Sequence, residues 1–114
     1  PIWFHWDGRA VTFGTPVRAP KLRALARNGA VAVTIDDSSS WPYRALLLRG
    51  QAVVEMLDDL SPEYAASACR YFGDEQGEAW AAQLRGQPMV RISLIPSWVA
   101  ILDFETRFPS ALTV

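Results

Sequence analysis

Residues 13–28, FGTPVRAPKLRALARN, lead from the end of a β-rich run into a short helix. Pro20 suits the first turn of a helix because its fixed φ is helical and its missing N–H has no partner to lose there. Leu22, Leu25 and Ala26 follow at helical spacing, and Asn28-Gly29 ends the pattern. The stretch therefore predicts a strand, a loop and a helix of about two or three turns.

Two cations, Arg18 and Lys21, stand at the expected N-terminal end of this helix. The helix dipole disfavours each cation there by roughly 0.3 to 1 kcal/mol, and a bound anion would offset that cost. A phosphate at this point would meet free backbone N–H groups, the Thr15 hydroxyl and both cationic side chains. Solvated surface charges are the plain alternative, because such clusters are common in loops. The residues alone leave both interpretations open.

The segments on either side of this stretch predict further strands. Ile2–Trp6 and Arg9–Thr15 are β-rich, and the Asp7-Gly8 pair between them supplies the positive φ angles of a two-residue hairpin turn. After the short helix, Ala30–Ile35 is almost continuously apolar, as is typical of a strand covered on both faces.

The second half of the chain predicts a long strand and two helices. Residues 43–57 alternate imperfectly around Gly50, which indicates one strand bent at that glycine. Residues 61–63, Ser-Pro-Glu, form a strong helix start, and this helix is expected to end at Gly73. A second helical pattern covers residues 74–84.

Two final strands are expected at residues 89–95 and 98–104, whereas the chain from Phe108 onward has no clear pattern. Hairpins and a bent strand, with helices set apart from them, favour an α+β fold with an antiparallel sheet over parallel βαβ winding. We predict a small closed barrel. The chain length of 114 residues suits one hydrophobic core, so residues 1–114 are expected to form a single domain.

Composition narrows the class of protein further. Half of the residues are apolar and 20% are charged, so the chain should fold. Five Trp give a lone domain of this length much apolar surface, and a second subunit could cover part of it. We therefore expect a homodimer. The net charge of −1 provides no general attraction to nucleic acid or to an anionic membrane. The single cysteine excludes an intramolecular disulfide, and without a leader or long apolar run a cytoplasmic protein is expected.

The stretch from residue 13 to residue 28 resembles the phosphate-binding segment of pyridoxamine 5'-phosphate oxidase-like split-barrel proteins. That segment is a strand ending in Thr, a loop, a Lys, a Leu four residues later and an Asn three residues after that. The matching residues here are Thr15, Lys21, Leu25 and Asn28. Looser likenesses lie at residues 31–37, 49–50 and 70–73 and around Pro96.

The resemblance implies a six-stranded antiparallel split β-barrel of α+β type with peripheral helices. Such proteins are dimers that bind FMN, or the deazaflavin coenzyme F-420, in a groove between subunits. The resemblance assigns Lys21 and Arg18 to the cofactor phosphate, with Thr15 as a hydroxyl donor. Lys21 is the only lysine among eleven basic residues, and this composition and the Trp-Pro-Tyr loop at residues 41–43 look more like the deazaflavin branch.

Two features depart from the family pattern. The oxidases proper have Ser-Arg directly before the Lys, whereas this chain has Ala19-Pro20, so one phosphate ligand is missing or replaced by Arg18. The first strand of the family, which carries further cofactor contacts, would precede Pro1. We therefore expect an N-terminally incomplete split barrel with its first strand missing.

Other candidate residues carry weaker signals. Trp41 either stacks on a cofactor or substrate, or folds onto the barrel as a loop aromatic. His5 is the only histidine and a poor metal ligand by itself, so no metal site is predicted. Cys69 lies in an alanine-rich helix and is most simply a small core residue. Three strand arginines, Arg44, Arg49 and Arg91, either line a groove or cover the barrel surface.

The first functional hypothesis is an oxidoreductase that holds a flavin or deazaflavin, whose ring performs hydride transfer to a small organic substrate. Because that chemistry belongs to the cofactor, no catalytic side chain is named. The second hypothesis is a non-catalytic protein that binds or carries a flavin-like ligand or haem on the same barrel. A third is a structural dimer that has lost its ligand.

Overall fold

The computed structural model describes residues 2–106, so the expectation for the chain from Phe108 onward lies outside the described residues. The strands are β1 (His5–Trp6), β2 (Val11–Thr15), β3 (Ala30–Asp37), β4 (Arg44–Leu57), β5 (Met89–Leu94) and β6 (Trp98–Asp103). The helices are α1 (Lys21–Arg27), α2 (Pro62–Phe72) and α3 (Asp74–Leu84). All six strands pair antiparallel in the order β1-β2-β5-β4-β3, with β6 also on β4. The predicted α+β fold and its element order are confirmed.

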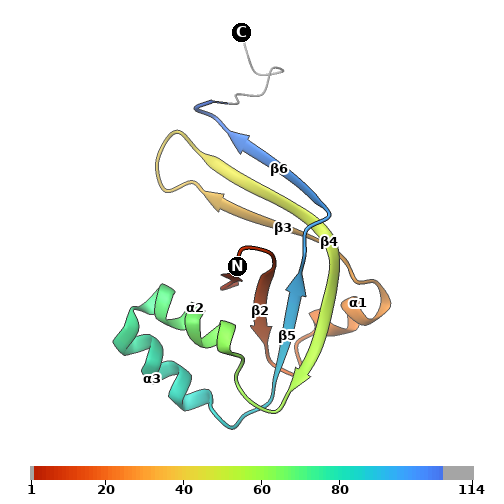
Figure 1. The fold of residues 1–114 in the computed structure, drawn as a ribbon, viewed down its shortest axis with the longest axis vertical. Helices are drawn as coiled ribbons and strands as arrows, with labels where there is room; N and C mark the ends of the chain where they lie inside the picture. The colour runs from red at the N-terminus through yellow and green to blue at the C-terminus, as the bar shows by residue number, and fades with distance from the viewer. Residues whose placement is uncertain (1, 107–114) are drawn as a thin grey trace.

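β4 divides the sheet into two parts (Figure 1). Residues 52–57 of β4 pair with β5 and, together with β1 and β2, form what we call the base. Residues 44–51 pair with β3, and β6 lies along residues 44–49; these strands form the arm. Gly50 lies where the pairing changes, and a Cβ atom there would come within 2.9 Å of the Ile95 carbonyl oxygen. The predicted bend at Gly50 is confirmed, because a side chain has no room at this crossing.

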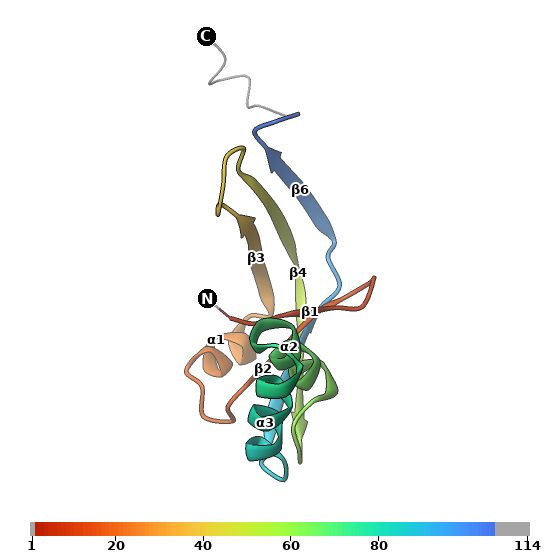
Figure 2. The ribbon, with the colours of Figure 1, turned by 90° about the vertical axis from the view of Figure 1, so that its left-hand side faces the viewer.

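The sheet is open and does not close into a barrel. Within the described residues, no strand pairs with the outer edge of β1 or of β3. Figure 2 shows the arm projecting away from the base and its helices. The radius of gyration is 16.4 Å, compared with about 13 Å for a compact domain of this length. The six-stranded split arrangement is therefore confirmed, whereas the prediction of a closed barrel is wrong.

The hairpin between β1 and β2 turns one residue later than predicted. Asp7 and Ala10 face each other, and the Asp7 N–H donates to the Ala10 carbonyl oxygen at 3.4 Å. The two loop residues are therefore Gly8, with a φ of +97°, and Arg9. A glycine in the first loop position suits a two-residue hairpin. The Asp7 carboxylate stabilises the turn by accepting the N–H groups of Arg9 and Ala10.

β3 is covered on one face, not on both as predicted. Its inward side chains pack on a buried cluster of Val11, Leu48 and Leu94. The inward side chains are Val31, Val33 and Ile35, and the outward, exposed ones are Ala30, Ala32 and Thr34. The small outward residues explain the continuous apolar run, and no helix or strand of the described chain covers them.

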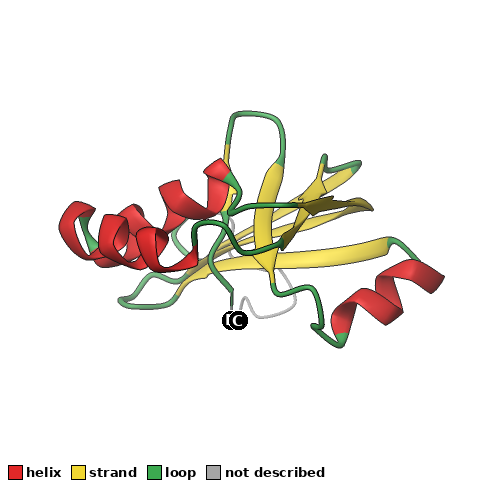
Figure 3. Ribbon diagram, turned by 90° about the horizontal axis from the view of Figure 1, so that it is seen from below, coloured by secondary structure: helices red, strands yellow, loops and turns green. Residues whose placement is uncertain are grey.

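The helices lie on opposite sides of the strands, with the α2–α3 pair on one side and α1 on the other (Figure 3). A second buried cluster, formed by Leu60, Ala81 and Met89, lies under the α2–α3 pair. α2 begins as predicted, because the Ser61 hydroxyl accepts the Tyr64 N–H at 3.1 Å and caps the helix. α1 has seven residues, about two turns, and is preceded by Pro20 as expected.

Candidate functional site

A cavity of about 730 Å³ lies on the inner, concave face of the sheet between α1, the base and β3. We call it the concave cavity. Most of its wall is apolar, formed by Phe4, Val11, Phe13, Leu25, Val31, Ile92 and Leu94 among others. Its polar wall residues include Lys21, Asn28, Thr34 and Asp36. The volume lies within the range that binds cofactors and drug-sized ligands.

A second cavity, of about 640 Å³, lies between the end of β2 and the helices α2 and α3. We call it the aromatic cavity, because half of the described residues in its wall are aromatic. These are Trp3, Tyr64, Tyr71, Phe72 and Trp80, and the remaining wall residues are Ile2, Gly14, Thr15, Pro16 and Lys21.

Lys21 lies at the junction of the two cavities. It lines both of them, together with Ile2 and Tyr71. Its ammonium group lies 6.0 Å from the centre of the Phe13 ring, and the first turn of α1 has no acidic residue. Among residues 2–106, the ion pairs involve only Arg44 and Arg91 as cations. The Lys21 charge is therefore available to an anion in either cavity.

The structure brings together two of the four predicted cofactor-binding residues. Thr15 lines the aromatic cavity with Lys21, although only 2% of its surface is exposed. Arg18 is exposed in the loop before α1 and lines neither cavity. Trp41 is 63% exposed in the loop between β3 and β4, where it packs on Tyr43 and Phe104. It lies at the tip of the arm, away from both cavities.

The aromatic wall is the part of the site that the sequence reasoning missed. Trp3 stacks on Tyr71, with ring centres 5.5 Å apart and planes 7° from parallel, and meets Phe72 edge-on at 4.7 Å. Trp80 donates its indole N–H to the Tyr64 hydroxyl at 3.1 Å. The sequence does indicate part of this wall, because the aromatic residues at positions 64, 71 and 72 share one face of the expected helix. The sequence could not show that Trp3 faces it.

Arg70 fixes the position of Tyr71 from outside the cavity. Its guanidinium lies over the Phe4 and Tyr71 rings, 4.5 Å and 4.8 Å from their centres. It also donates to the Tyr71 hydroxyl at 3.0 Å and to the backbone carbonyl of Phe4. Arg70 thus links the end of α2 to the chain segment just before β1, which also carries Trp3.

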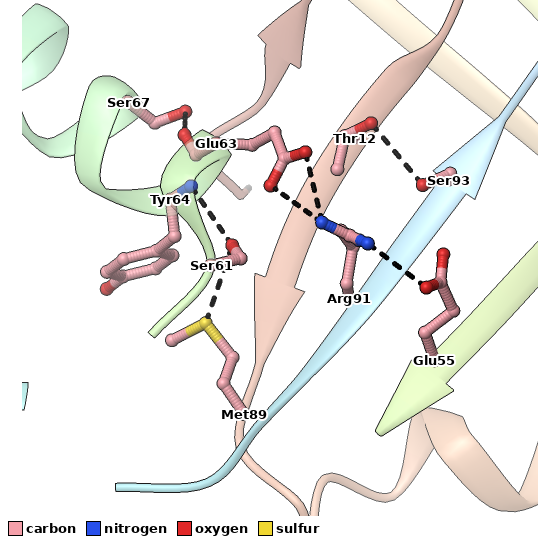
Figure 4. A network of polar contacts seen from close by, with 9 residues as sticks. All are labelled: Thr12, Glu55, Ser61, Glu63, Tyr64, Ser67, Met89, Arg91 and Ser93. Atoms are coloured by element: carbon pink, nitrogen blue, oxygen red, sulfur yellow. Dashed lines mark hydrogen bonds and ion pairs between the residues drawn. The ribbon is translucent and has the colours of Figure 1, made fainter. Parts of the chain in front are cut away.

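A polar network holds α2 against the base (Figure 4). The Arg91 guanidinium on β5 lies 3.0 Å from Glu55 on β4 and 3.3 Å from Glu63 on α2. Hydrogen bonds and attraction from these carboxylates raise the pKa of Arg91, chiefly through Glu55. Because Glu63 precedes Tyr64, the network helps to set the position of the aromatic wall.

The strand arginines do not line either cavity. Arg44 pairs with Asp37 at 3.6 Å, and Arg49 lies 4.3 Å from the centre of the Trp98 ring on the outer face of the arm. The surface role is confirmed for Arg44 and Arg49, whereas Arg91 has neither role because it bridges Glu55 on β4 and Glu63 on α2.

Four aspartates have a lowered pKa, and each lies in a turn or at a strand end. They are Asp7, Asp37, Asp59 and Asp103. The pKa of Asp59 is lowered chiefly because the Gly86 N–H donates to its carboxylate at 2.7 Å, with the Leu60 N–H as a second donor. None of the four lines a cavity, so these carboxylates stabilise the fold and are not part of the site.

His5 and Cys69 also lie outside the two cavities. Cys69 is a free, partly buried thiol on α2 beside Gly77 of α3. Within residues 2–106, no three His, Cys, Asp or Glu side chains gather as metal ligands would.

Three solved structures resemble this chain in fold. The conserved hypothetical protein Rv2991 from Mycobacterium tuberculosis is 16% identical, with a TM-score of 0.69 over 98% of this chain and 71% of that one. A Listeria innocua protein assigned as a pyridoxamine 5'-phosphate oxidase is 22% identical, with a TM-score of 0.59 over 89% and 74% of the two chains. The chain has the split-barrel fold of pyridoxamine 5'-phosphate oxidase-like proteins. An F420 reductase matches this split barrel at 22% identity, with a TM-score of 0.57 over 87% and 75% of the chains.

The likeness of this split barrel to known proteins is one of fold. No protein-family model and no curated protein matches its sequence. In the described part of the chain, no helix has the length and apolar character needed to cross a bilayer.

Proposed function

We propose that this split-barrel protein is an oxidoreductase that binds FMN or a deazaflavin and transfers hydride to or from a small organic substrate. The observation that carries the proposal is the position of Lys21, a cation without an acidic partner among residues 2–106, at the junction of two ligand-sized cavities. Similar folds that bear the names of a pyridoxamine 5'-phosphate oxidase and an F420 reductase support it.

The residues around Lys21 fit a phosphorylated, flat cofactor. An ammonium group is a strong partner for a phosphate, and Thr15 adds a hydroxyl at the same junction. The concave cavity is large enough for a ring system and has an apolar wall with a few polar groups. We assign the phosphate to the Lys21 side of that cavity, and we propose that Arg18, exposed in the preceding loop, turns toward it on binding. When bound, the cofactor ring supplies the hydride chemistry, and the protein orients it.

We also propose that the protein is a homodimer in which the arm contacts a second copy. The arm exposes large apolar side chains on both faces: Trp98, Val99, Ile101 and Leu102 are between 39% and 54% exposed. Large apolar side chains that lie together and stay exposed mark an interaction surface. In such a dimer Trp41, at the tip of the arm, is available to the cofactor of the partner copy. We also propose a cytoplasmic location, because a chain with a single cysteine is not built around internal disulfides.

The test is a binding titration of the full chain with FMN and, separately, with coenzyme F-420. Lys21→Gln is expected to weaken binding by about 1.5 to 3 kcal/mol, or roughly 10- to 150-fold, because one charge-assisted contact to the phosphate is lost. Riboflavin, which lacks the phosphate, should bind the wild type and Lys21→Gln equally.

Arg23→Gln provides the matched control, because it removes the same charge from an exposed position of α1 that lines neither cavity. Equal FMN affinity of wild type and Lys21→Gln would overturn the phosphate assignment. Tight binding without turnover in reduction assays would favour the alternative function, a flavin or deazaflavin carrier.

A further inference from the structure

The aromatic cavity has more exposed ring surface than the packing of α2 and α3 requires. Tyr71, Phe72 and Trp80 are 44%, 46% and 38% exposed, although each contacts another aromatic ring. Large aromatic side chains that gather in one place and stay open to solvent mark a ligand site. The rings therefore form a wall with unused stacking surface.

The rings of this wall are held in place before any ligand binds. The hydrogen bond from Trp80 to Tyr64 fixes two of them, and Arg70 fixes Tyr71 from the outer side. Trp3 is held between Tyr71 and Phe72. A preformed wall binds a rigid ligand without the entropic cost of ordering its own side chains.

The charge at the cavity selects the kind of ring it can bind. Aromatic walls also bind organic cations through the negative faces of their rings, but a fixed positive charge in the same cavity repels such ligands. Among the lining residues that the structure describes, Lys21 is the only fully charged one, and none is Asp or Glu. The cavity is therefore suited to a flat ring that carries an anionic group.

We infer that the aromatic cavity binds a flat aromatic carboxylate. Its ring lies against Trp80 and the Trp3 cluster, and its carboxylate points to Lys21. The ammonium group has three N–H donors, so it can contact a carboxylate from this side and a phosphate from the concave cavity. That the carboxylate is the substrate of the enzyme depends on the proposed function, whereas its binding to this cavity does not.

The experiment uses calorimetric titration of the full chain, free of flavin, with three probes of similar size. These are 2-naphthoate, the uncharged 2-naphthamide and the saturated decahydro-2-naphthoate. We expect 2-naphthoate to bind most tightly, because it alone offers both a flat ring and a charge. Trp80→Leu should weaken 2-naphthoate binding about 2- to 10-fold through lost ring contact. Lys21→Gln should remove the preference for 2-naphthoate over 2-naphthamide.

Trp6→Leu is the control, because Trp6 is similarly exposed, at 47%, but lines neither cavity. Circular dichroism verifies that each variant is folded. Equal affinity for all three probes, or a Trp80→Leu variant that binds 2-naphthoate like the wild type, would overturn the inference. Binding of 2-naphthoate without any binding of FMN or F-420 would support this site and contradict the proposed function. Binding of FMN or F-420 without any binding of 2-naphthoate would support the proposed function and overturn the inference.

Discussion

Gly77 of α3 lies directly against the backbone of Cys69 in α2. A Cβ atom at position 77 would come within 2.4 Å of the Cys69 Cα and 2.5 Å of its backbone nitrogen. The two helices thus touch through bare backbone at this point. Because Tyr71 and Trp80 lie on these two helices, the contact also sets the spacing of the aromatic wall.

The first prediction concerns this contact. In an exposed helix Gly→Ala raises stability by up to about 1 kcal/mol, but here the added methyl group meets backbone that cannot rotate away. We expect Gly77→Ala to lower the free energy of unfolding by about 1 to 3 kcal/mol in urea denaturation. Gln76→Ala, at the neighbouring exposed position of α3, should change it by less than about 0.5 kcal/mol. A stabilised Gly77→Ala would show that the helices are not in close contact.

The second prediction concerns the Arg91 network. Arg91→Met leaves the carboxylates of Glu55 and Glu63 without their shared partner, and their side chains are only 45% and 26% exposed. We expect a loss of about 1 to 2 kcal/mol of unfolding free energy, after allowance for screening by solvent. Arg44→Met removes a more exposed pair and should cost at most about 0.5 kcal/mol. Equal effects of the two substitutions would show that Arg91 does not anchor α2.

The third prediction concerns pH. The folded state holds the pKa of Asp59 below its ordinary value of 3.8, so the folded protein binds this proton less readily than the unfolded chain. The resulting stability is fully present above the ordinary value and is lost as the pH falls through the lowered one. Asp59→Asn removes this titration. The unfolding free energy of the wild type should therefore exceed that of Asp59→Asn by less and less as the pH falls from about 5 to about 3.

Urea denaturation across that pH range is the measurement. Asp58→Asn, at the neighbouring exposed aspartate, is the control and should follow the wild type. A difference between wild type and Asp59→Asn that stays constant with pH would rule out the assigned role of the carboxylate.

The fourth prediction tests the arm as a contact between copies. Ile101 is 49% exposed on β6, on the same face as Leu46, its partner on β4. A homodimer should have twice the chain mass of 12.7 kDa in light scattering. Ile101→Asp should shift that mass toward the monomer, because a charge buried in an apolar contact is costly. Ala82→Asp, on the exposed side of α3, should leave the mass unchanged, and a monomeric wild type would refute the dimer.

The elements of this fold could be predicted because their signals are local. Ser61 caps α2 through the backbone three residues away, and Gly73 ends that helix with a φ of +85°. Gly50 marks the bend of β4 because a side chain there would meet the chain after β5. Each of these constraints depends on neighbouring residues or on the absence of a side chain, so the sequence carries it directly.

The closure of the sheet and the shape of the site depend on contacts between distant residues. The run from Ala30 to Ile35 is equally apolar whether one face is covered or two, so β3 could not be assigned correctly. Lys21 could be proposed from the sequence, together with Arg18, because two cations at an expected helix start are a local anomaly; its role at a cofactor phosphate stays a prediction. Trp3 and Tyr71 are 68 positions apart, and only the packing of α2 on the base brings them together.

The place of β5 in the strand order sets the timing of folding. β2 and β4 do not pair with each other, since β5 lies between them and bonds to both. On a ribosome, the base therefore cannot assemble until β5, residues 89–94, has emerged. Until then one edge of β2 and one edge of residues 52–57 of β4 lack their partner strand, and such long-range pairing is slow. Because unpaired strand edges can pair with another chain, the interval before β5 is synthesised is the one in which this chain is most exposed to aggregation.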